Sequence, residues 1–393
     1  MPVSIKDRGS RLLTRVDLQI ISVTLLAKVA VLAFGIVVVT LLGSTFAPDT
    51  DGVAGDAPPL LTPWTRWDAP HYLDLAVFGY RATDAGDLVG ADGYRSNDPG
   101  ALPRFIVFFP LFPWLVSGAT VLVHDPSTAA FIVSGIALLC VGPLLYRLVA
   151  VEQGPLVARR SVWFMLLFPT AYFLYIGYPE SLFLALVLGS FLAARSDRWW
   201  LAGLLGCLAT AARINGLILI PALAVEALLQ WRETPGFRPR WLAIGLVPLG
   251  FVVYLGLNLA VYGDAVAFLQ IQRGEWGKVL SPPWVGIGAL LHSGLPRAWI
   301  PELAFVLLGV VGTIVSAFRF RPSWTVWMAG NLLLATSTSV VLSVPRYSIV
   351  LFPLFVWFAL MAKSRPAAIA IGGLSALGLV IFAGRFALGA WAF

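Results

Sequence analysis

The chain is poor in charged side chains. Asp, Glu, Lys and Arg make up only 12% of its 393 residues, whereas about 25% is usual for a soluble protein. Apolar and aromatic residues account for 59% of the chain. This composition excludes a soluble enzyme, a disordered protein and a disulfide-rich scaffold, and it indicates an integral membrane protein with many spans.

Residue types that form cross-links and metal sites are also scarce. The two cysteines, Cys140 and Cys207, lie within apolar runs, and the three histidines are scattered along the chain. They provide neither a disulfide framework nor the spacing of metal ligands. No P-loop and no dinucleotide-binding glycine motif occurs, which argues against a pump driven by a nucleotide. The sequence therefore points to no cofactor and no metal.

The charged residues that are present are distributed unevenly. The stretch 43–103 contains nine aspartates against three arginines, a net charge of −6, so the rest of the +7 chain carries +13. Because Lys and Arg concentrate in the cytoplasmic loops of membrane proteins, we assign the acidic stretch to the outside and six basic regions to the cytoplasm. These regions are Lys6/Arg8/Arg11/Arg15, Arg147/Arg159/Arg160, Arg195/Arg198, Arg232/Arg238/Arg240, Arg319/Arg321 and Lys363/Arg365.

The apolar runs between these regions predict an all-α polytopic membrane protein with about eleven transmembrane helices, within a range of 10 to 13. The first run is long enough to span and has no cleavage site typical of a signal peptide, so we interpret it as a retained helix. Residues 1–393 then form one integral membrane domain with its C-terminus outside. The predicted spans lie near 18–42, 128–147, 160–177, 180–195, 199–213, 214–230, 241–262, 301–318, 323–343, 346–362 and 366–385.

Two long outer loops follow from this topology, at 43–127 and 263–300. The apolar stretch 104–122 within the first loop contains Pro110 and Pro113, which would break a straight helix. We therefore expect this stretch to form a juxtamembrane or re-entrant segment and not a further span.

The first outer loop contains a polar and aromatic segment, 66–80, that is the best candidate for an active-site motif. Asp68 comes shortly before Pro70, which is typical of a helix that begins with an aspartate N-cap and has a proline in its first turn. In such a helix Asp68, His71 and Tyr72 would share one face.

Local chemistry leaves several roles open for this segment. Asp68 could serve only as a helix cap, and His71 could simply hydrogen-bond Asp68 or a lipid headgroup. The spacing of Asp68, His71 and Asp74 also allows a metal site, although these positions rotate around a helix. Trp67 and Tyr72 are residue types that suit a membrane–water interface.

Five segments, taken in order along the chain, resemble one known family. They are WDAPHY at 67–72, FFPLFP at 108–113, FPTAYFLYIGYPESLF at 168–183, TAARINGLILIP at 210–221 and SVPRYSIVLFPLF at 343–355. The series is similar to that of the PIG-V-like mannosyltransferases, relatives of the second mannosyltransferase of GPI-anchor assembly within the GT-C glycosyltransferase superfamily. Pro179 and Val344 depart from the usual family residues, but no charged candidate is missing.

The resemblance implies a GT-C-like fold and a membrane glycosyltransferase. The donor would be a polyprenyl-phosphate sugar, with mannose as the expected hexose, and the acceptor would be a hydroxyl of a lipid-linked glycan, a glycolipid or a protein. Inverting displacement at the sugar needs a base for the acceptor proton, and the family motif gives this role to Asp68. Trp67, His71, Tyr72 and Glu180 would contact substrate, although Glu180 could instead cap a helix or form an ion pair.

The leaving lipid phosphate needs nearby cations more than it needs an acid, and Arg can bind phosphate without a metal. Arg213 and Arg346 fall at predicted outer ends of spans, where the positive-inside rule disfavours them, so they are candidates for binding the donor phosphate. Arg273 and Lys278 in the second outer loop are further candidates. The alternatives are an interfacial anchor for Arg346, an ion pair with Glu180 for Arg213, and an amphipathic interface helix for the loop.

Many spans and a net positive charge would equally suit a transporter or a lipid flippase. A transporter would place charged groups near the midplane of several broken spans, whereas these candidates gather at outer ends. A third interpretation is that the protein is a catalytically inactive relative that acts as an assembly partner. We expect a multi-pass protein of a bacterial plasma membrane, or of the endoplasmic reticulum in a eukaryote, with its site on the outer face. Glu226, His124 and His292 are expected to be structural.

Overall fold

The computed structural model describes residues 14–43, 57–80, 102–292 and 296–392. These residues are mostly helical, and the only β-type pairing among them is an isolated antiparallel bridge between Leu280 and Thr338. The acidic residues Asp49, Asp51, Asp56, Asp84, Asp87, Asp92 and Asp98 of the first outer loop lie outside the described residues.

Six helical segments among the described residues are long and apolar enough to cross a membrane. They are α1 (Arg15–Leu42), α4 (Pro126–Gln153), η5 (Ile214–Ile218) with α9 (Leu219–Glu233), η6 (Pro239–Leu246) with α10 (Leu249–Tyr262), α13 (Pro296–Arg319) and α17 (Arg365–Ala387). A seventh crossing is possible if α15 (Val344–Tyr347) with η7 (Ser348–Val350) and α16 (Pro353–Met361) form one span, bent by 83°. The protein is therefore a multi-pass membrane protein, as its composition predicts.

The remaining helices are shorter. They are α2 (Asp68–Phe78), α3 (Leu111–Val123), α5 (Pro155–Leu166), α6 (Tyr172–Tyr175), α7 (Glu180–Arg195), α8 (Trp199–Ala212), α11 (Ala267–Trp276), α12 (Pro283–His292) and α14 (Pro322–Thr336), with single 3₁₀ turns η3 (Thr62–Trp64) and η4 (Leu102–Val107).

Each predicted span coincides with helical residues, but eleven uninterrupted crossings are not seen in the described part of the chain. The range 160–177 is divided, because α5 ends at Leu166 and Pro169 follows three residues later. Proline cannot donate a backbone hydrogen bond and disfavours helical geometry in the residue before it. The range 346–362 is likewise divided between η7 and α16. The all-α polytopic fold is thus confirmed, while the count of eleven spans is not.

The segment with two prolines forms a short helix. Pro110 is the residue before the first turn of α3 and Pro113 lies within that turn, where a missing N–H costs nothing. The prolines therefore begin a helix here and do not break one. Because α3 has 13 residues, it is about 20 Å long, shorter than the ~30 Å hydrocarbon core of a bilayer.

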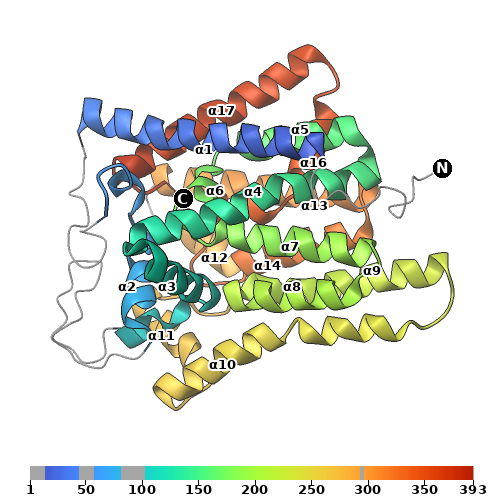
Figure 1. Cartoon of the computed structure of the whole chain (residues 1–393), viewed down its shortest axis with the longest axis horizontal. Coiled ribbons are helices and arrows are strands. Elements are labelled where there is room, and N and C mark those ends of the chain that lie inside the picture. Colours follow the sequence, from blue (N-terminus) through green and yellow to red (C-terminus); the bar gives the residue numbers. More distant parts are fainter. Residues whose placement is uncertain (1–13, 44–56, 81–101, 293–295, 393) are drawn as a thin grey trace.

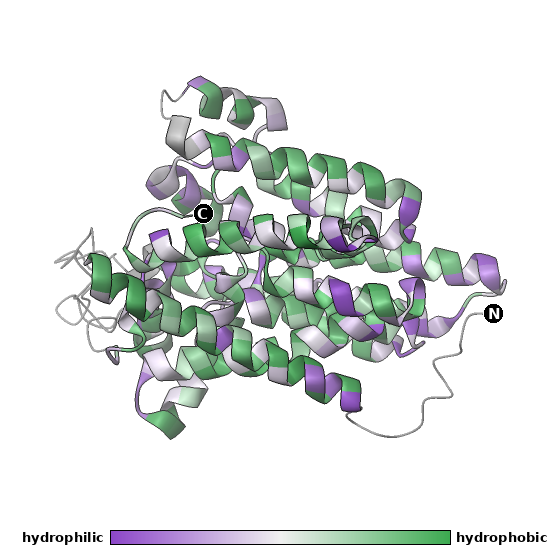
Figure 2. Ribbon diagram, turned by 90° about the horizontal axis from the view of Figure 1, so that it is seen from above, coloured by the Kyte–Doolittle hydropathy of each residue, from purple (hydrophilic) through white to green (hydrophobic). Residues whose placement is uncertain are grey.

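The longer helices lie side by side, and the polar connections gather at their ends. In Figure 1, α1, α4, α7, α8 and α10 run alongside one another, with α2, α3 and α11 at one end and α5 and the start of α1 at the other. Green apolar residues dominate the length of these helices in Figure 2. Large apolar side chains are exposed along the peripheral helices α1 and α17, including Leu25, Leu26, Val29, Ile369, Leu374 and Leu377. Such a belt is expected where lipid and not water surrounds the helices.

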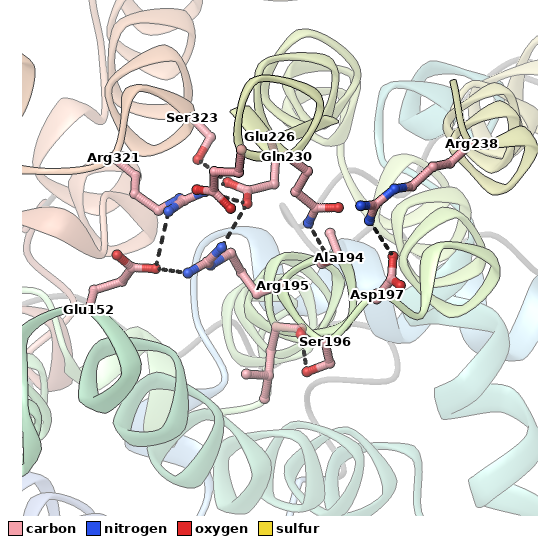
Figure 3. A network of polar contacts seen from close by, with 12 residues as sticks. Glu152, Ala194, Arg195, Ser196, Asp197, Glu226, Gln230, Arg238, Arg321 and Ser323 are labelled. Atoms are coloured by element: carbon pink, nitrogen blue, oxygen red, sulfur yellow. Dashed lines mark hydrogen bonds and ion pairs between the residues drawn. The ribbon is translucent and has the colours of Figure 1, made fainter. Parts of the chain in front are cut away.

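Buried charges at the end of the bundle away from α2 are joined in a network (Figure 3). Glu226 on α9 is fully buried and accepts hydrogen bonds from Arg195 at 3.2 Å and from Arg321 at 2.9 and 3.1 Å. Glu152 at the end of α4 lies 2.5 Å from Arg195. Three helix ends thus meet through paired charges, and Glu226 has the structural contacts that the sequence predicts for it.

The other basic regions make contacts of the same kind. Arg147 pairs with Asp17 at 2.6 Å, which joins α4 to the start of α1. Arg160 donates a hydrogen bond of 2.7 Å to the carbonyl of Ala362, next to Lys363. Arg240 lies 2.6 Å from Asp197. Regions that are far apart in sequence and share a predicted side of the membrane are therefore joined to one another.

We expect Glu226→Gln to lower the free energy of unfolding by about 3 kcal/mol, because it leaves two arginines without the buried anion between them. The matched control is Glu233→Gln. Glu233 is 62% exposed and lies 3.7 Å from Arg321, so its loss should change stability by less than about 1 kcal/mol. Thermal unfolding of detergent-purified protein measures both. Equal effects of the two substitutions would contradict the structural importance of this network.

Candidate active site

The candidate site begins where α2 begins. Trp67 has φ 61° and precedes the helix, and Asp68 is the first helical residue. The prediction that Asp68 caps the helix with its side chain is therefore wrong, because Trp67 occupies the cap position and no side chain caps this helix. A tryptophan in the left-handed region is strained, and such strain often occurs where a functional group must be held in place. The carboxylate of Asp68 does not bond the backbone of its own helix but contacts Arg346.

Four side chains of alternating charge form a continuous chain of ion pairs. Arg346 Nη1 donates a hydrogen bond to Asp68 Oδ2, and Arg346 Nε donates to Glu180 Oε1 at 2.5 Å. Arg213 Nη1 donates to the same Glu180 oxygen at 2.6 Å. The order is Asp68, Arg346, Glu180, Arg213, and we call these four residues the ion-pair chain. Its members come from α2, α15, the first turn of α7 and the residue after α8.

The two ends of the ion-pair chain are more exposed than its middle. The side chains of Arg346 and Glu180 are only 4% and 1% exposed, whereas those of Asp68 and Arg213 are 33% and 16% exposed. Asp68 Oδ1 accepts no hydrogen bond from any described residue. The two side chains at the ends are thus partly accessible to solvent, while the inner pair is closed off.

Aromatic rings surround the buried arginine. The Arg346 guanidinium lies over Phe173 and Tyr178, with 4.9 and 4.8 Å to the ring centroids. Such cation–π contacts stabilise a desolvated cation. The Tyr178 hydroxyl donates to the carbonyl of Arg66 at 2.6 Å and accepts from the N–H of Asp68 at 3.1 Å. Tyr178 therefore contacts both partners of the Asp68–Arg346 pair.

Opposing effects act on the pKa of Asp68. Burial disfavours the charged form and by itself would raise the pKa, but the charge and hydrogen bond of Arg346, together with the charges of His71 and Arg213, hold it below its usual value. The balance of these effects favours the ionised form of the Asp68 carboxyl group.

The substrate-contact candidates on α2 lie beside the ion-pair chain. His71 stacks on Phe105 with 4.3 Å between ring centroids and is close enough to Asp68 for their charges to interact. Tyr72 packs edge-on against Tyr178 at 6.1 Å, and burial raises its pKa. Trp67 packs edge-on against Trp391 at 5.1 Å. Their roles in binding a substrate stay predictions.

The two loop candidates do not join the ion-pair chain. Arg273 on α11 is exposed. Lys278 follows α11 and is near enough to Glu302 on α13 for their charges to interact. Of the four predicted phosphate-binding cations, the structure thus brings only Arg213 and Arg346 together. Arg213 has the ion pair with Glu180 that the sequence leaves open as an alternative.

Several residues of the site were missed by the sequence reasoning. Phe173, Tyr178 and Tyr347 stand within the family-like segments, but nothing in those segments distinguishes a ring under a guanidinium from a ring in the core. Glu302 was not singled out, although an acid within an apolar helix is itself a signal of function. Among the described residues no three His, Cys, Asp or Glu side chains are grouped as a metal site.

The fold places this chain in a known structural class. It is similar to ArnT from Cupriavidus metallidurans, whose crystal structure has undecaprenyl phosphate bound, with a TM-score of 0.51 and 15% sequence identity over 91% of this chain and 62% of ArnT. At that identity the similarity shows the fold alone, which is the GT-C fold. The fold predicted from the sequence is confirmed.

The sequence itself has nearer relatives. It is 30% identical over 172 residues to GPI alpha-1,6-mannosyltransferase 2 of Cricetulus griseus, and 31% identical over 173 residues to the same protein of Mus musculus. The first match covers 41% of this chain and only 31% of the relative, so about a third of the relative's length is matched. No family model matches the chain. These relatives confirm the resemblance to the PIG-V-like family that the motifs indicate.

We expect Glu180→Gln to destabilise the protein by about 3 kcal/mol, because Arg346 and Arg213 would then face each other without an anion. The double variant Glu180→Gln/Arg213→Gln should be more stable than the two single effects predict, since only one guanidinium is left. Thermal unfolding of the four proteins gives the coupling. Strict additivity of the two effects would show that Glu180 does not hold the two arginines together.

Proposed function

We propose that this protein is a membrane glycosyltransferase that moves a hexose from a polyprenyl phosphate to a hydroxyl group of an acceptor. The observation that carries the proposal is Asp68, an accessible and ionised carboxylate at the open end of a buried ion-pair chain. A carboxylate in that state can take up a proton, and an alcohol needs such a base to attack carbon. The GT-C fold and the mannosyltransferase relatives support the same reaction, and the relatives favour mannose.

In the proposed step the acceptor oxygen attacks the anomeric carbon of the donor sugar. The acceptor proton passes to Asp68 Oδ1, a new carbon–oxygen bond forms, and the bond from the anomeric carbon to the phosphate oxygen breaks. The polyprenyl phosphate leaves with the electron pair of that bond and gains negative charge. A single displacement inverts the configuration, so a β-linked donor would give an α-linked product.

The leaving phosphate needs a cation that can reach it. Arg213 is the better candidate, because its side chain is 16% exposed and only Nη1 of its guanidinium bonds Glu180. Arg346 is almost fully buried and contacts both carboxylates, so we assign it mainly to orienting Asp68. Glu180 is 1% exposed and bonds both arginines, which favours its ion-pair role over contact with the sugar. Arg273 and Lys278 would act only if the 263–300 loop approached the donor.

We propose that the site faces the side of the membrane opposite the cytoplasm. The ion-pair chain lies at the start of α7, and the Arg195–Glu226–Arg321 network lies at its end. About 23 Å of helix separates the two ends, and the positive-inside rule assigns the arginine-rich network to the cytoplasm. The acceptor would then be a lipid-linked glycan, a glycolipid or a protein. It would lie outside a bacterial plasma membrane or in the endoplasmic reticulum lumen of a eukaryote.

Purified protein incubated with labelled polyprenyl-phosphate mannose and a membrane lipid extract should transfer the label. We expect Asp68→Asn to reduce the rate by about 10²- to 10⁴-fold, the usual contribution of a positioned general base. Asp264→Asn is the matched control, because Asp264 lies in the second outer loop and its side chain bonds only Val266 and Gln270 among the described residues. Unchanged transfer by a folded Asp68→Asn protein would eliminate Asp68 as the base. Native protein that neither binds nor uses the donor would contradict the proposed reaction with this donor and leave the transporter or flippase alternative open.

The rate should also depend on pH through Arg346. Asp68 loses its function when it is protonated, and Arg346 holds its pKa low against the effect of burial. In Arg346→Gln the effect of burial remains, so the acidic fall of kcat/KM should move to higher pH. We expect no such movement in Arg240→Gln, which alters an ion pair with Asp197 at the other end of the bundle. An unshifted profile in Arg346→Gln would contradict this account of Asp68.

A further inference from the structure

A buried carboxylate outside the ion-pair chain is bonded to the turn that carries Arg346. Glu302 lies in the first part of α13 and is 3% exposed. Its Oε1 accepts the N–H of Ser343 at 2.8 Å, and its Oε2 accepts the N–H of Val344, also at 2.8 Å. Both oxygens are thus used by two successive amides immediately before Arg346.

Leaving these two N–H groups without hydrogen-bond acceptors would destabilise the turn. Ser343 has φ 69°, in the left-handed region that a serine seldom adopts. The first N–H groups of a helix have no partner within the helix, and here the helix is only the four residues of α15. Glu302 satisfies both donors and so stabilises a backbone conformation that the local sequence does not favour.

The same turn is held from a second side. The Thr170 hydroxyl donates to the carbonyl of Pro345 at 2.8 Å, and Val344 is buried in a small cluster with Val306 of α13 and Val341. The turn then presents two groups to the site. Arg346 contacts Asp68 and Glu180, and the Tyr347 ring lies under the Arg213 guanidinium at 5.4 Å.

The burial of the Glu302 carboxyl group is not explained by an ion pair. No described residue forms one with it, and Lys278 interacts with it only at longer range. A carboxylate in an apolar helix is costly unless its hydrogen bonds are satisfied, and here the bonds that satisfy it are the two amides of the turn.

We propose that Glu302 is a positioning residue of this site, which sets where Arg346 meets Asp68 by holding the 343–347 turn. It touches neither the proposed donor nor the acceptor. Its kinetic consequence rests on the proposed glycosyl transfer, whereas its effect on the Asp68–Arg346 pair does not.

The first test uses Glu302→Gln, which keeps the shape of the side chain but places an NH₂ group against one of the two N–H donors. We expect kcat to fall by about 10²-fold with a smaller change in KM, the effect of a misplaced catalytic group. The acidic limb of kcat/KM should move to higher pH, as in Arg346→Gln, because the arginine would no longer hold Asp68 ionised. Glu226→Gln is the control, since it removes an equally buried acid and should leave the acidic limb of the kcat/KM pH profile in place.

The decisive comparison adds Glu302→Gln to Arg346→Gln. If Glu302 acts through Arg346, the second substitution should add little to the rate loss and nothing to the pH shift. The proposal would be overturned if the two substitutions had additive effects and Glu302→Gln left the acidic side of the kcat/KM pH profile in place. Glu302 would then only stabilise the fold. If Glu302→Gln fails to fold, Ser343→Gly relieves the left-handed strain, and the cycle is repeated in that background.

A readout without transfer separates this inference from the proposed function. The melting temperatures of native protein, Glu302→Gln, Asp68→Asn and the double variant form a second cycle. Coupling between Glu302 and Asp68 supports the positioning role even if no sugar is transferred. Additive changes in melting temperature overturn the positioning role, whatever the transfer assay shows about the enzyme.

Discussion

The buried guanidinium of Arg346 is the constraint on which the site depends. A cation that is almost removed from solvent must be paired on every side, because an uncompensated buried charge costs several kcal/mol. Asp68 and Glu180 supply the anions and two aromatic rings cover its faces. Each partner comes from a different helix, so the packing of α2, α7 and α15 and the geometry of the site determine one another.

The two ends of the bundle use the same interaction for different purposes. Around Glu226 two arginines and a serine use both carboxylate oxygens, so the network is closed and joins helices. At the other end one oxygen of Asp68 accepts no hydrogen bond from any described residue, and a third of its side chain is exposed. A saturated carboxylate stabilises a fold, whereas an ionised carboxylate with a free oxygen can also accept a proton. This difference is the physical basis for placing the chemistry at the α2 end.

Much of the fold and part of the site could be predicted from the sequence. Apolar runs and basic clusters predicted the helices and grouped the arginines correctly, because hydropathy and charge are local properties. Asp68 was singled out by its place in the family-like motif, and Arg213 and Arg346 because the positive-inside rule disfavours arginine at outer ends of spans. The structure brings these three residues together with Glu180, while their functional roles stay predictions. The interruptions at 167–171 and 351–352 have a local signal in Pro169 and Pro353. The absence of Arg273 and Lys278 from the ion-pair chain has none, because it depends on packing between distant segments.

The sequence by itself determined the class of protein, the approximate helices and the identity of the charged side chains. Only the tertiary structure decided which charges meet: Asp68 contacts Arg346 across 278 positions of chain, and the cap expected at Asp68 belongs to Trp67 instead. It also decided the role of Glu302, whose two oxygens bond amides some forty residues away. The reason is that an ion pair or a backbone strain is fixed by distances between elements, and such distances are set by packing and not by the order of residues.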